Sequence, residues 1–227
     1  MNDLNGATCE AATEHAPVHA LEQVAFLGET LGPLFLNDPG RGGKAACAAL
    51  ASFASLDVRA AAAEWPFVDE GEARAALELM CVGAAAGVDD DLVWEYRRLF
   101  VGPAKKAAPP WGSVYTDREC VVFGASTLEL RAWMRAHGIE RLGDKAEPED
   151  HIGLMLLLMT WIADNRPELL DEYLREHLLT WAGHFLSLAE REAAHPFYEG
   201  LARLTCASLE GVREARGLEV AYPRFYR

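Results

Sequence analysis

Apolar residues along this chain recur mainly at spacings of three and four positions. Residues 21–36 follow this spacing until Asp38-Pro39-Gly40 interrupts it, the alanine-rich residues 44–56 follow it, and residues 72–86 follow it up to Gly87. This spacing places the apolar side chains on one face of an α-helix, and proline and glycine commonly mark its end. The pattern therefore predicts three helices in the first ninety residues.

A fourth helix is predicted to begin at the acidic triplet Asp89-Asp90-Asp91. Negative side chains at a helix start are favoured by the helix dipole, so we prefer this interpretation to a metal-binding triplet. The apolar face of the helix would consist of five residues, namely Leu92, Val93, Tyr96, Leu99 and Phe100.

The second half of the chain has clearer helix boundaries. Residues 126–129, Ser-Thr-Leu-Glu, match a capping box, and the helix that they open should end at Gly138. Pro148, Pro167 and Pro196 each precede a helical pattern, as proline does in the first turn of a helix. Residues 168–194 suit two helices broken near Leu179 or Gly183, and the last helix should cover about residues 197–216.

The fold class follows from what the pattern lacks. No segment alternates with period two for long, and no repeat of twenty to fifty residues is visible. We therefore predict an all-α protein, a single domain over residues 1–227 with about eight to ten helices and a candidate hinge near residues 140–148. The longest apolar run, Ile152 to Ala163, is too short to span a bilayer and predicts a buried helix rather than membrane insertion.

Charge and cysteine content narrow the classes of partner and compartment. The chain has 35 acidic and 21 basic residues, a formal net charge of -14, which disfavours binding to nucleic acid or to anionic membranes. The first residues lack the basic and apolar regions of a signal peptide. Five cysteines without paired spacing indicate reduced thiols, so a cytoplasmic location is predicted.

Candidate catalytic chemistry is confined to one cluster, EPEDH, from Glu147 to His151. No GxSxG, HExxH, GxGxxG or P-loop motif is present, and no histidine pairs with histidine or cysteine at metal-ligand spacing, so no catalytic residue, metal or cofactor is assigned. Adjacent helical residues point about 100° apart, so Asp150 is poorly placed to orient His151. The favoured interpretation is a helix start in which His151 caps or is solvated. The alternative is acid–base catalysis in a small helical hydrolase or nucleotide-processing enzyme.

An irregular segment between the predicted helices raises a different question. Residues 101–117 contain Pro103, Pro109 and Pro110, yet they also carry the bulky Trp111. Proline stiffens such a segment and lowers the entropy that is lost when it becomes ordered. Trp111 would either cover the core as a lid or form part of an exposed apolar groove, and we favour the groove.

Several phrases occur in order and together carry a family resemblance. They are EYRRLFVGP, PPWGSVYTDRE, VVFGASTLELRAWMRAHGI, EPEDHIGLMLLLM and REAAHPFYEGLARLT, and they lie within residues 92–208. In this combination the chain resembles the TorD/DmsD family of twin-arginine redox-enzyme maturation chaperones, and within it the DmsD type that serves dimethyl sulfoxide reductase. The first ninety residues match the family only in being helical.

The resemblance implies an all-α, non-enzymatic chaperone. Such proteins bind the twin-arginine signal peptide and the catalytic subunit of a molybdopterin-dependent reductase, and delay export until the cofactor is loaded. The twin-arginine translocase is a further candidate partner. Residues that match the leader-binding surface of the family are Tyr96, Leu99, Phe100, Pro110, Trp111, Asp150 and His151. Relatives carry tryptophan where this chain has Tyr96, which would affect the choice of leader.

The chemistry of a twin-arginine leader suits these residues. The leader is a basic pair followed by an apolar stretch, and it requires carboxylates and an exposed apolar groove. Leu99, Phe100 and Trp111 would supply the groove, and Asp150 would bind a guanidinium group. In the alternative, Leu99 and Phe100 only complete the core face of their helix and Trp111 covers it as a lid. Protonation of His151 near pH 6 would then place a positive charge beside Asp150 and weaken binding.

Overall fold

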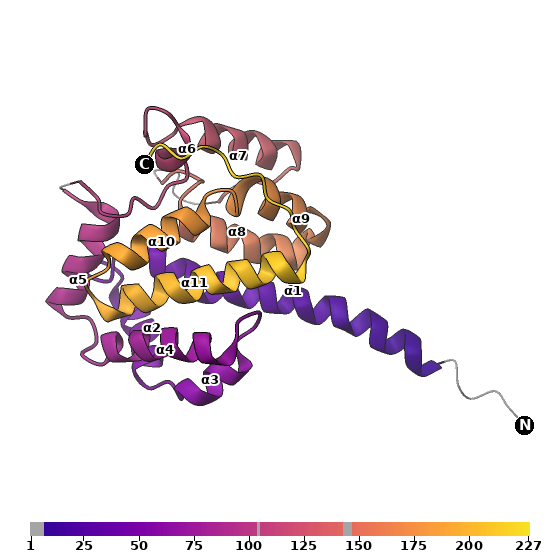
Figure 1. Ribbon diagram of the computed structural model, residues 1–227, viewed down its shortest axis with the longest axis horizontal. Helices are drawn as coiled ribbons and strands as arrows, with labels where there is room; N and C mark the ends of the chain where they lie inside the picture. Colours follow the sequence, from indigo (N-terminus) through magenta and orange to yellow (C-terminus); the bar gives the residue numbers. More distant parts are fainter. Residues whose placement is uncertain (1–6, 104, 143–146) are drawn as a thin grey trace, which may run out of the picture.

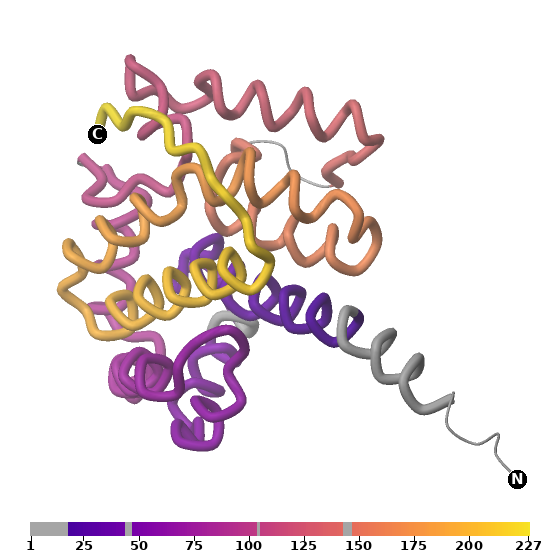
Figure 2. Tube along the Cα trace, turned by 45° about the vertical axis from the view of Figure 1, so that its right-hand side comes forward, coloured from indigo at the N-terminus to yellow at the C-terminus, as the bar shows by residue number. Residues whose placement is uncertain are grey.

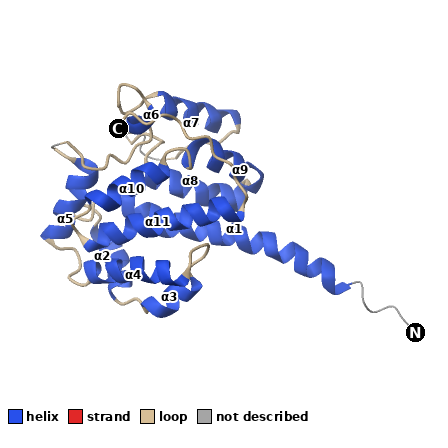
Figure 3. Ribbon diagram, in the orientation of Figure 1, coloured by secondary structure: helices blue, strands red, loops and turns tan. Residues whose placement is uncertain are grey.

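The computed structural model describes residues 7–103, 105–142 and 147–227, with the side chains of residues 7–17 and 44–46 left out. Helices dominate the described chain (Figure 1, Figure 3). The α-helices are α1 (Ala7–Leu36), α2 (Gly43–Ala54), α3 (Val58–Glu64), α4 (Glu70–Ala84), α5 (Asp90–Tyr96), α6 (Ser113–Thr116), α7 (Ala125–Ala136), α8 (Ile152–Asn165), α9 (Leu170–Tyr173), α10 (Ala182–Glu192) and α11 (Pro196–Ala215). A π-helical turn η1 (Arg97–Val101) continues α5, a 3-10 turn η2 (Pro167–Leu169) precedes α9, and a second π-helical turn η3 (Leu174–Leu178) continues α9.

The predicted all-α fold is confirmed for the described residues. They contain eleven α-helices, slightly more than the eight to ten expected, because α3 and α6 were missed. These helices have seven and four residues, too few for apolar periodicity to register. None of the described helices is both long and apolar enough to cross a bilayer. The predicted hinge near residues 140–148 overlaps residues 143–146, which lie outside the described chain.

Most helix boundaries match the sequence signals, with one correction. The carboxylate of Asp89 accepts a hydrogen bond from the Leu92 N–H (2.8 Å) and caps α5, which explains the acidic triplet. The capping box at residues 126–129 is wrong: no side chain of that motif caps α7, whose N-cap is Gly124. The N–H of Ala125 donates instead to the carboxylate of Asp117 (3.2 Å), so a residue from the preceding loop takes this role.

Two helix crossings rely on very close backbone contact. Helix α1 packs along α8, and α4 packs along α11 (Figure 2). A Cβ atom at Gly153 of α8 would lie 2.6 Å from the carbonyl oxygen of Gly32 in α1, and one at Gly200 of α11 would lie 2.5 Å from that of Ala76 in α4. Glycine at these crossings lets the helices approach until their backbones touch, which fixes α8 against α1.

Aromatic rings fill the core between α1, α5 and α10. Phe100 makes an edge-to-face contact with Phe35 (5.8 Å between ring centroids) and a tilted contact with Phe185 (6.2 Å). The hydroxyl of Tyr96 donates to the carbonyl oxygen of Phe35 (2.8 Å), so its one polar atom is satisfied. The apolar face predicted for the fourth helix therefore points into the core.

A buried ion pair ties α5 to the segment between α10 and α11. Arg98 donates two hydrogen bonds to Glu95 (2.7 and 2.9 Å), and the Ala194 N–H donates to the same carboxylate (2.6 Å). Burial raises the pKa of Glu95, but the hydrogen bonds from Arg98 and Ala194 outweigh it, so the pKa lies below its usual range. Glu95 and Arg98 of the EYRRLF phrase thus hold the fold together.

Replacement of Arg98 by alanine should destabilise the protein, because the buried carboxylate of Glu95 would lose its counter-ion. We expect a loss of about 3 kcal/mol in the free energy of unfolding, measured by urea denaturation at pH 7. Arg74→Ala is the matched control, since Arg74 pairs with Glu78 at the surface (3.7 Å), and it should cost less than about 1 kcal/mol. Equal losses in the two variants would contradict the structural role of the Glu95–Arg98 pair.

Candidate functional site

The segment before α6 that contains Pro103, Pro109 and Pro110, here called the proline-rich segment, is attached by its backbone at both ends. At one end the N–H groups of Ala107 and Ala108 donate to the carbonyl oxygens of Arg98 (3.1 Å) and Leu99 (3.0 Å). At the other end Trp111 and His151 form an antiparallel bridge. Because these bonds satisfy an otherwise irregular backbone, the segment holds a defined position against the start of α8.

Trp111 lies half-buried at the centre of this arrangement. Its indole N–H donates to the carboxylate of Glu147 (2.6 Å), and its ring meets the ring of His151 edge to face (6.0 Å between centroids). The Lys106 ammonium lies 5.2 Å from the ring centroid of Trp111. Trp111 therefore packs on the core and still reaches the surface, so it combines features of the lid and of the groove.

The other apolar residues expected in the groove are buried. Leu99 and Phe100 are 0% and 3% exposed, and Tyr96 and Pro110 are buried as well. The prediction of an exposed groove made by Leu99 and Phe100 is wrong, because the same apolar face that forms α5 and η1 is needed to fill the core. Tyr96, Leu99 and Phe100 therefore lie in the core beneath the proline-rich segment.

Asp150 is buried and only half satisfied. The side chain is 1% exposed, and its Oδ2 atom accepts hydrogen bonds from the Ser113 N–H (2.7 Å) and the Ser126 hydroxyl (3.3 Å). Within the described part of the chain its Oδ1 atom has no hydrogen-bond partner. A buried carboxylate oxygen without a donor is costly, so a further donor at Oδ1 would stabilise Asp150.

This carboxylate lies in the wall of an acidic pocket of about 300 Å³. We use the term acidic pocket for the cavity lined by Thr116, Ala125, Ser126, Glu129, Leu130, Asp150, Met155, Glu176, His177, Thr180, Trp181, Ala221 and Pro223. Three of these described residues are carboxylates and none is lysine or arginine. The pocket therefore suits a cation that can donate several hydrogen bonds.

His177 also lines the acidic pocket. It lies in η3, and its Nε2 atom has no partner among the described residues. Burial lowers the pKa of His177, against the opposing effect of Glu176 and Glu172, so the ring is neutral at pH 7. Turns of π-helix are uncommon and occur often at functional sites, as η3 does here.

His151 has a structural role at the start of α8. Its Nδ1 atom accepts a hydrogen bond from the Gly153 N–H (3.1 Å), so His151 caps the helix, as the favoured interpretation of EPEDH allowed. Burial, together with the charge of Arg141, lowers the pKa of His151 to about 3. The predicted protonation near pH 6 is therefore wrong, because a 4% exposed imidazole is held neutral by its surroundings.

The same geometry argues against an acid–base pair in EPEDH. Asp150 accepts from Ser113 and Ser126, whereas His151 accepts from Gly153, so the two side chains bond to different partners. A general base works best with a pKa near the working pH, and a pKa of about 3 leaves His151 a weak base. The EPEDH cluster precedes and caps α8, and its Asp150 lines the acidic pocket.

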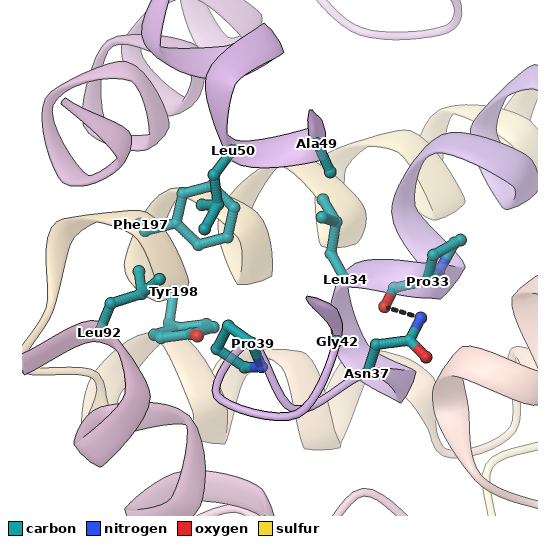
Figure 4. Close-up of a pocket in the computed structure, with 10 residues that line it drawn as sticks. All are labelled: Pro33, Leu34, Asn37, Pro39, Gly42, Ala49, Leu50, Leu92, Phe197 and Tyr198. Atoms are coloured by element: carbon teal, nitrogen blue, oxygen red, sulfur yellow. Dashed lines mark hydrogen bonds between the residues drawn. The ribbon is translucent and has the colours of Figure 1, made fainter. Parts of the chain in front are cut away.

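Two other cavities lie on the side of α1 that faces α2. The smaller, about 140 Å³, is shown in Figure 4 with Leu34, Leu50 and Phe197 in its wall. None of the ten residues drawn there carries a carboxylate, an imidazole or an amine. The larger, about 920 Å³, is an open groove between α1, α2 and α3. Neither contains a buried polar atom that lacks a partner, so the acidic pocket is the better candidate site.

Comparison with known proteins places the chain among chaperones. Residues 68–187 match the family model described as the nitrate reductase delta subunit. The chain is 46% identical over 141 residues to the probable Tat proofreading chaperone DmsD of Haemophilus influenzae, which covers 62% of this chain and 70% of that protein. It is 44% identical over 149 residues to the Tat proofreading chaperone DmsD of Salmonella typhimurium (64% and 71%) and 26% identical over 132 residues to the chaperone protein TorD of Vibrio cholerae (53% and 60%).

The chain belongs to the TorD/DmsD family of chaperones, which the nitrate reductase delta subunit model describes. The family resemblance stated from EYRRLFVGP, PPWGSVYTDRE and EPEDH is therefore confirmed. In this member the structure brings Trp111, Asp150 and His151 together, with Pro110 beneath them.

Sequence reasoning missed three polar residues of the acidic pocket, namely Glu129, Glu176 and His177. Glu129 lies on α7, and Glu176 and His177 lie on η3. Glu129 and Glu176 are 47 positions apart along the chain, and no motif connects them. Only the packing of α7, α8 and η3 brings them to one cavity. The general excess of acidic residues was the one available signal.

The depressed pKa of His151 predicts a loss of stability in mild acid. The unfolded imidazole titrates near 6.5 and the folded one near 3, so stability is complete above pH 6.5 and is lost progressively as the pH falls toward 3. We expect the free energy of unfolding to fall by about 2 kcal/mol between pH 7.5 and pH 5 through this group.

Urea denaturation of the wild type and of His151→Asn over this pH range is the measurement. Asparagine can still cap α8 but does not titrate, so the variant should lose most of the pH dependence. A variant with the same slope as the wild type would show that His151 is not buried as a neutral group.

Proposed function

We propose that this protein is a cytoplasmic chaperone that binds the twin-arginine signal peptide of a molybdopterin-dependent reductase precursor, of the dimethyl sulfoxide reductase type, and delays its export until the cofactor is loaded. Membership of the family that contains the Tat proofreading chaperones DmsD supports this function. The catalytic subunit that carries the leader is the proposed client, and the twin-arginine translocase is the proposed next partner.

The observation that supports leader binding most directly concerns Asp150, which lines the acidic pocket and whose Oδ1 atom has no hydrogen-bond partner among the described residues. A guanidinium group is a permanently charged fork of hydrogen-bond donors, and it matches a carboxylate in both charge and shape. Glu129 and Glu176 add negative charge, and the neutral His177 in the same wall adds no positive charge. We propose that one arginine of the leader enters this pocket.

The proposed leader surface keeps the residues carried over from the family in two roles. Trp111 is half-buried and contacts the buried His151, and Asp150, which is also buried, lines the acidic pocket. Tyr96, Leu99 and Phe100 lie in the core, where the Leu99 carbonyl oxygen accepts from Ala108 of the proline-rich segment, and Pro110 is a buried part of that segment. Replacement of Tyr96, Leu99 or Phe100 would therefore affect leader binding by changing the position of Trp111.

A second candidate, a small hydrolase or nucleotide-processing enzyme, has no supporting observation. It would require His151 to act as a base, and the side chain is buried with a pKa of about 3. The named relatives are chaperones rather than enzymes. We therefore assign no catalytic activity.

The Asp150→Asn variant should bind a twin-arginine leader peptide at least about tenfold more weakly than the wild type, because a charge-assisted hydrogen bond is lost. Asparagine can still accept from the Ser113 N–H, so the fold should remain. Calorimetric titration at pH 7.5 gives the dissociation constants. The net charge of -14 should also make association faster at low salt.

Asp91→Asn is the matched control, since it removes one charge from an exposed position on α5. It should change affinity less than about twofold. If both variants lose affinity equally, only the overall charge of the protein matters and the acidic pocket is not the arginine site.

Trp111→Ala should weaken leader binding by more than about 1 kcal/mol, as expected for an aromatic residue at the centre of an interface. The melting temperature should fall only modestly, because the ring is half-buried and the proline-rich segment keeps its backbone bonds. Leader titration and thermal denaturation of the same sample separate the two effects. A large fall in melting temperature with unchanged affinity would make Trp111 a structural lid.

A further inference from the structure

The loop between α6 and α7 exposes a run of apolar side chains. Val121, Val122 and Phe123 are 41%, 39% and 45% exposed, although they are consecutive and bulky. We call residues 118–123 the apolar loop. Three neighbouring apolar side chains at a surface are more than the scattered exposure that is normal for a protein, so the apolar loop calls for an explanation.

The apolar loop begins and ends at the wall of the acidic pocket. Thr116 precedes it and Ala125 follows it, and both residues line the pocket. Asp117 closes the base of the loop, since its carboxylate accepts from the N–H groups of Glu119 (2.9 Å) and Ala125 (3.2 Å). Phe123 is two residues from Ala125, so its Cα atom lies within about 7 Å of that wall.

The backbone of the apolar loop is held in an unusual conformation. Cys120 and Phe123 have φ angles of 51° and 65°, a left-handed region that residues other than glycine rarely adopt. Such conformations persist only where the surroundings determine them, and they concentrate at functional sites. The Arg131 guanidinium lies 5.2 Å from the ring centroid of Phe123 and pairs with Glu149 (2.5 Å), the neighbour of Asp150.

We propose that the apolar loop binds the apolar stretch of a twin-arginine leader whose arginine occupies the acidic pocket. This inference rests on the proposed function. Leu99 and Phe100 cannot provide the apolar contact because they are buried, whereas Val121, Val122 and Phe123 are exposed in the loop between Thr116 and Ala125, two residues that line the pocket. The apolar stretch follows the arginine pair in the same peptide, so it leaves the pocket at its rim and meets the nearest apolar surface there.

Charge favours a twin-arginine leader over a second copy of this chain as the ligand of this surface. The pocket offers Asp150, Glu129 and Glu176 to a basic group, and the apolar loop adjoins it directly. A basic group joined to an apolar helix-forming segment fits both surfaces at once. A second copy of this chain, with its net charge of -14, would bring like charges together at the same place.

Two leader peptides test the proposal. The first carries the twin arginines and the apolar stretch, and the second has the same arginines with that stretch replaced by glycine and serine. Val121→Ser with Val122→Ser should weaken binding of the first peptide by about tenfold and of the second by less than about twofold, because only the first buries apolar surface. Phe123→Asn should act in the same way, and asparagine tolerates the positive φ.

Matched controls come from the other side of the molecule. Val82 on α4 is 67% exposed and Phe26 on α1 is 44% exposed, and Val82→Ser and Phe26→Asn should leave both affinities unchanged. Fluorescence anisotropy gives the dissociation constants, circular dichroism confirms that each variant is folded, and sedimentation gives its oligomeric state.

The outcomes separate the two proposals. If the wild type binds neither peptide, the proposed function fails and this inference fails with it. If the wild type binds, Asp150→Asn weakens binding and the loop variants do not, only the role of the apolar loop is overturned. Equal loss of both peptides in the loop variants, or a change in oligomeric state without a change in affinity, overturns it as well.

Discussion

The carboxylate of Asp150 joins the segments on which the candidate site depends. Its Oδ2 atom holds the N-terminus of α6 through Ser113 and the first turn of α7 through Ser126, while its own carbonyl oxygen accepts from Gly112. One side chain thereby fixes the proline-rich segment, α7 and the start of α8 relative to one another. Asp150 also lines the acidic pocket, and its buried Oδ1 atom has no hydrogen-bond partner among the described residues.

Binding and stability place different demands on the same region. The apolar residues of α5 and η1 fill the core, and the glycine contacts between α1 and α8 fix the base on which the proline-rich segment rests. Rigid support lowers the entropy lost when a flexible leader is captured. The surface then needs only a few accessible groups, such as Trp111, the acidic pocket and the apolar loop. This division explains why Tyr96, Leu99 and Phe100 of the EYRRLFVGP phrase are buried.

The fold could be predicted from the sequence because helix periodicity and helix ends are local signals. The cap of α5 at Asp89, the end of α4 before Gly87 and the break between η3 and α10 all followed from such signals. The cap of α7 could not be predicted, because the carboxylate that bonds Ala125 belongs to Asp117, eight residues earlier. Long-range hydrogen bonds of this kind depend on how the loop folds back.

The candidate site was predicted only in part. Trp111, Asp150 and His151 were identified from their phrases. The burial of Leu99 and Phe100 was one of two open interpretations and that of His151 was not predicted, because a helical pattern shows that a face is apolar without showing whether it is covered. The low pKa of His151 follows from that burial and was missed for the same reason. Glu176 and His177 reach the acidic pocket through a π-helical turn that no sequence pattern announced.

The central claim is that Asp150 binds an arginine of the leader, and a double-mutant cycle measures this pair directly. The cycle combines Asp150→Asn with leaders in which the first, the second or both arginines are replaced by glutamine. We expect a coupling free energy of at least about 1 kcal/mol between Asp150 and one of the two arginines. Additive effects at both arginines, with a coupling near zero, would contradict it.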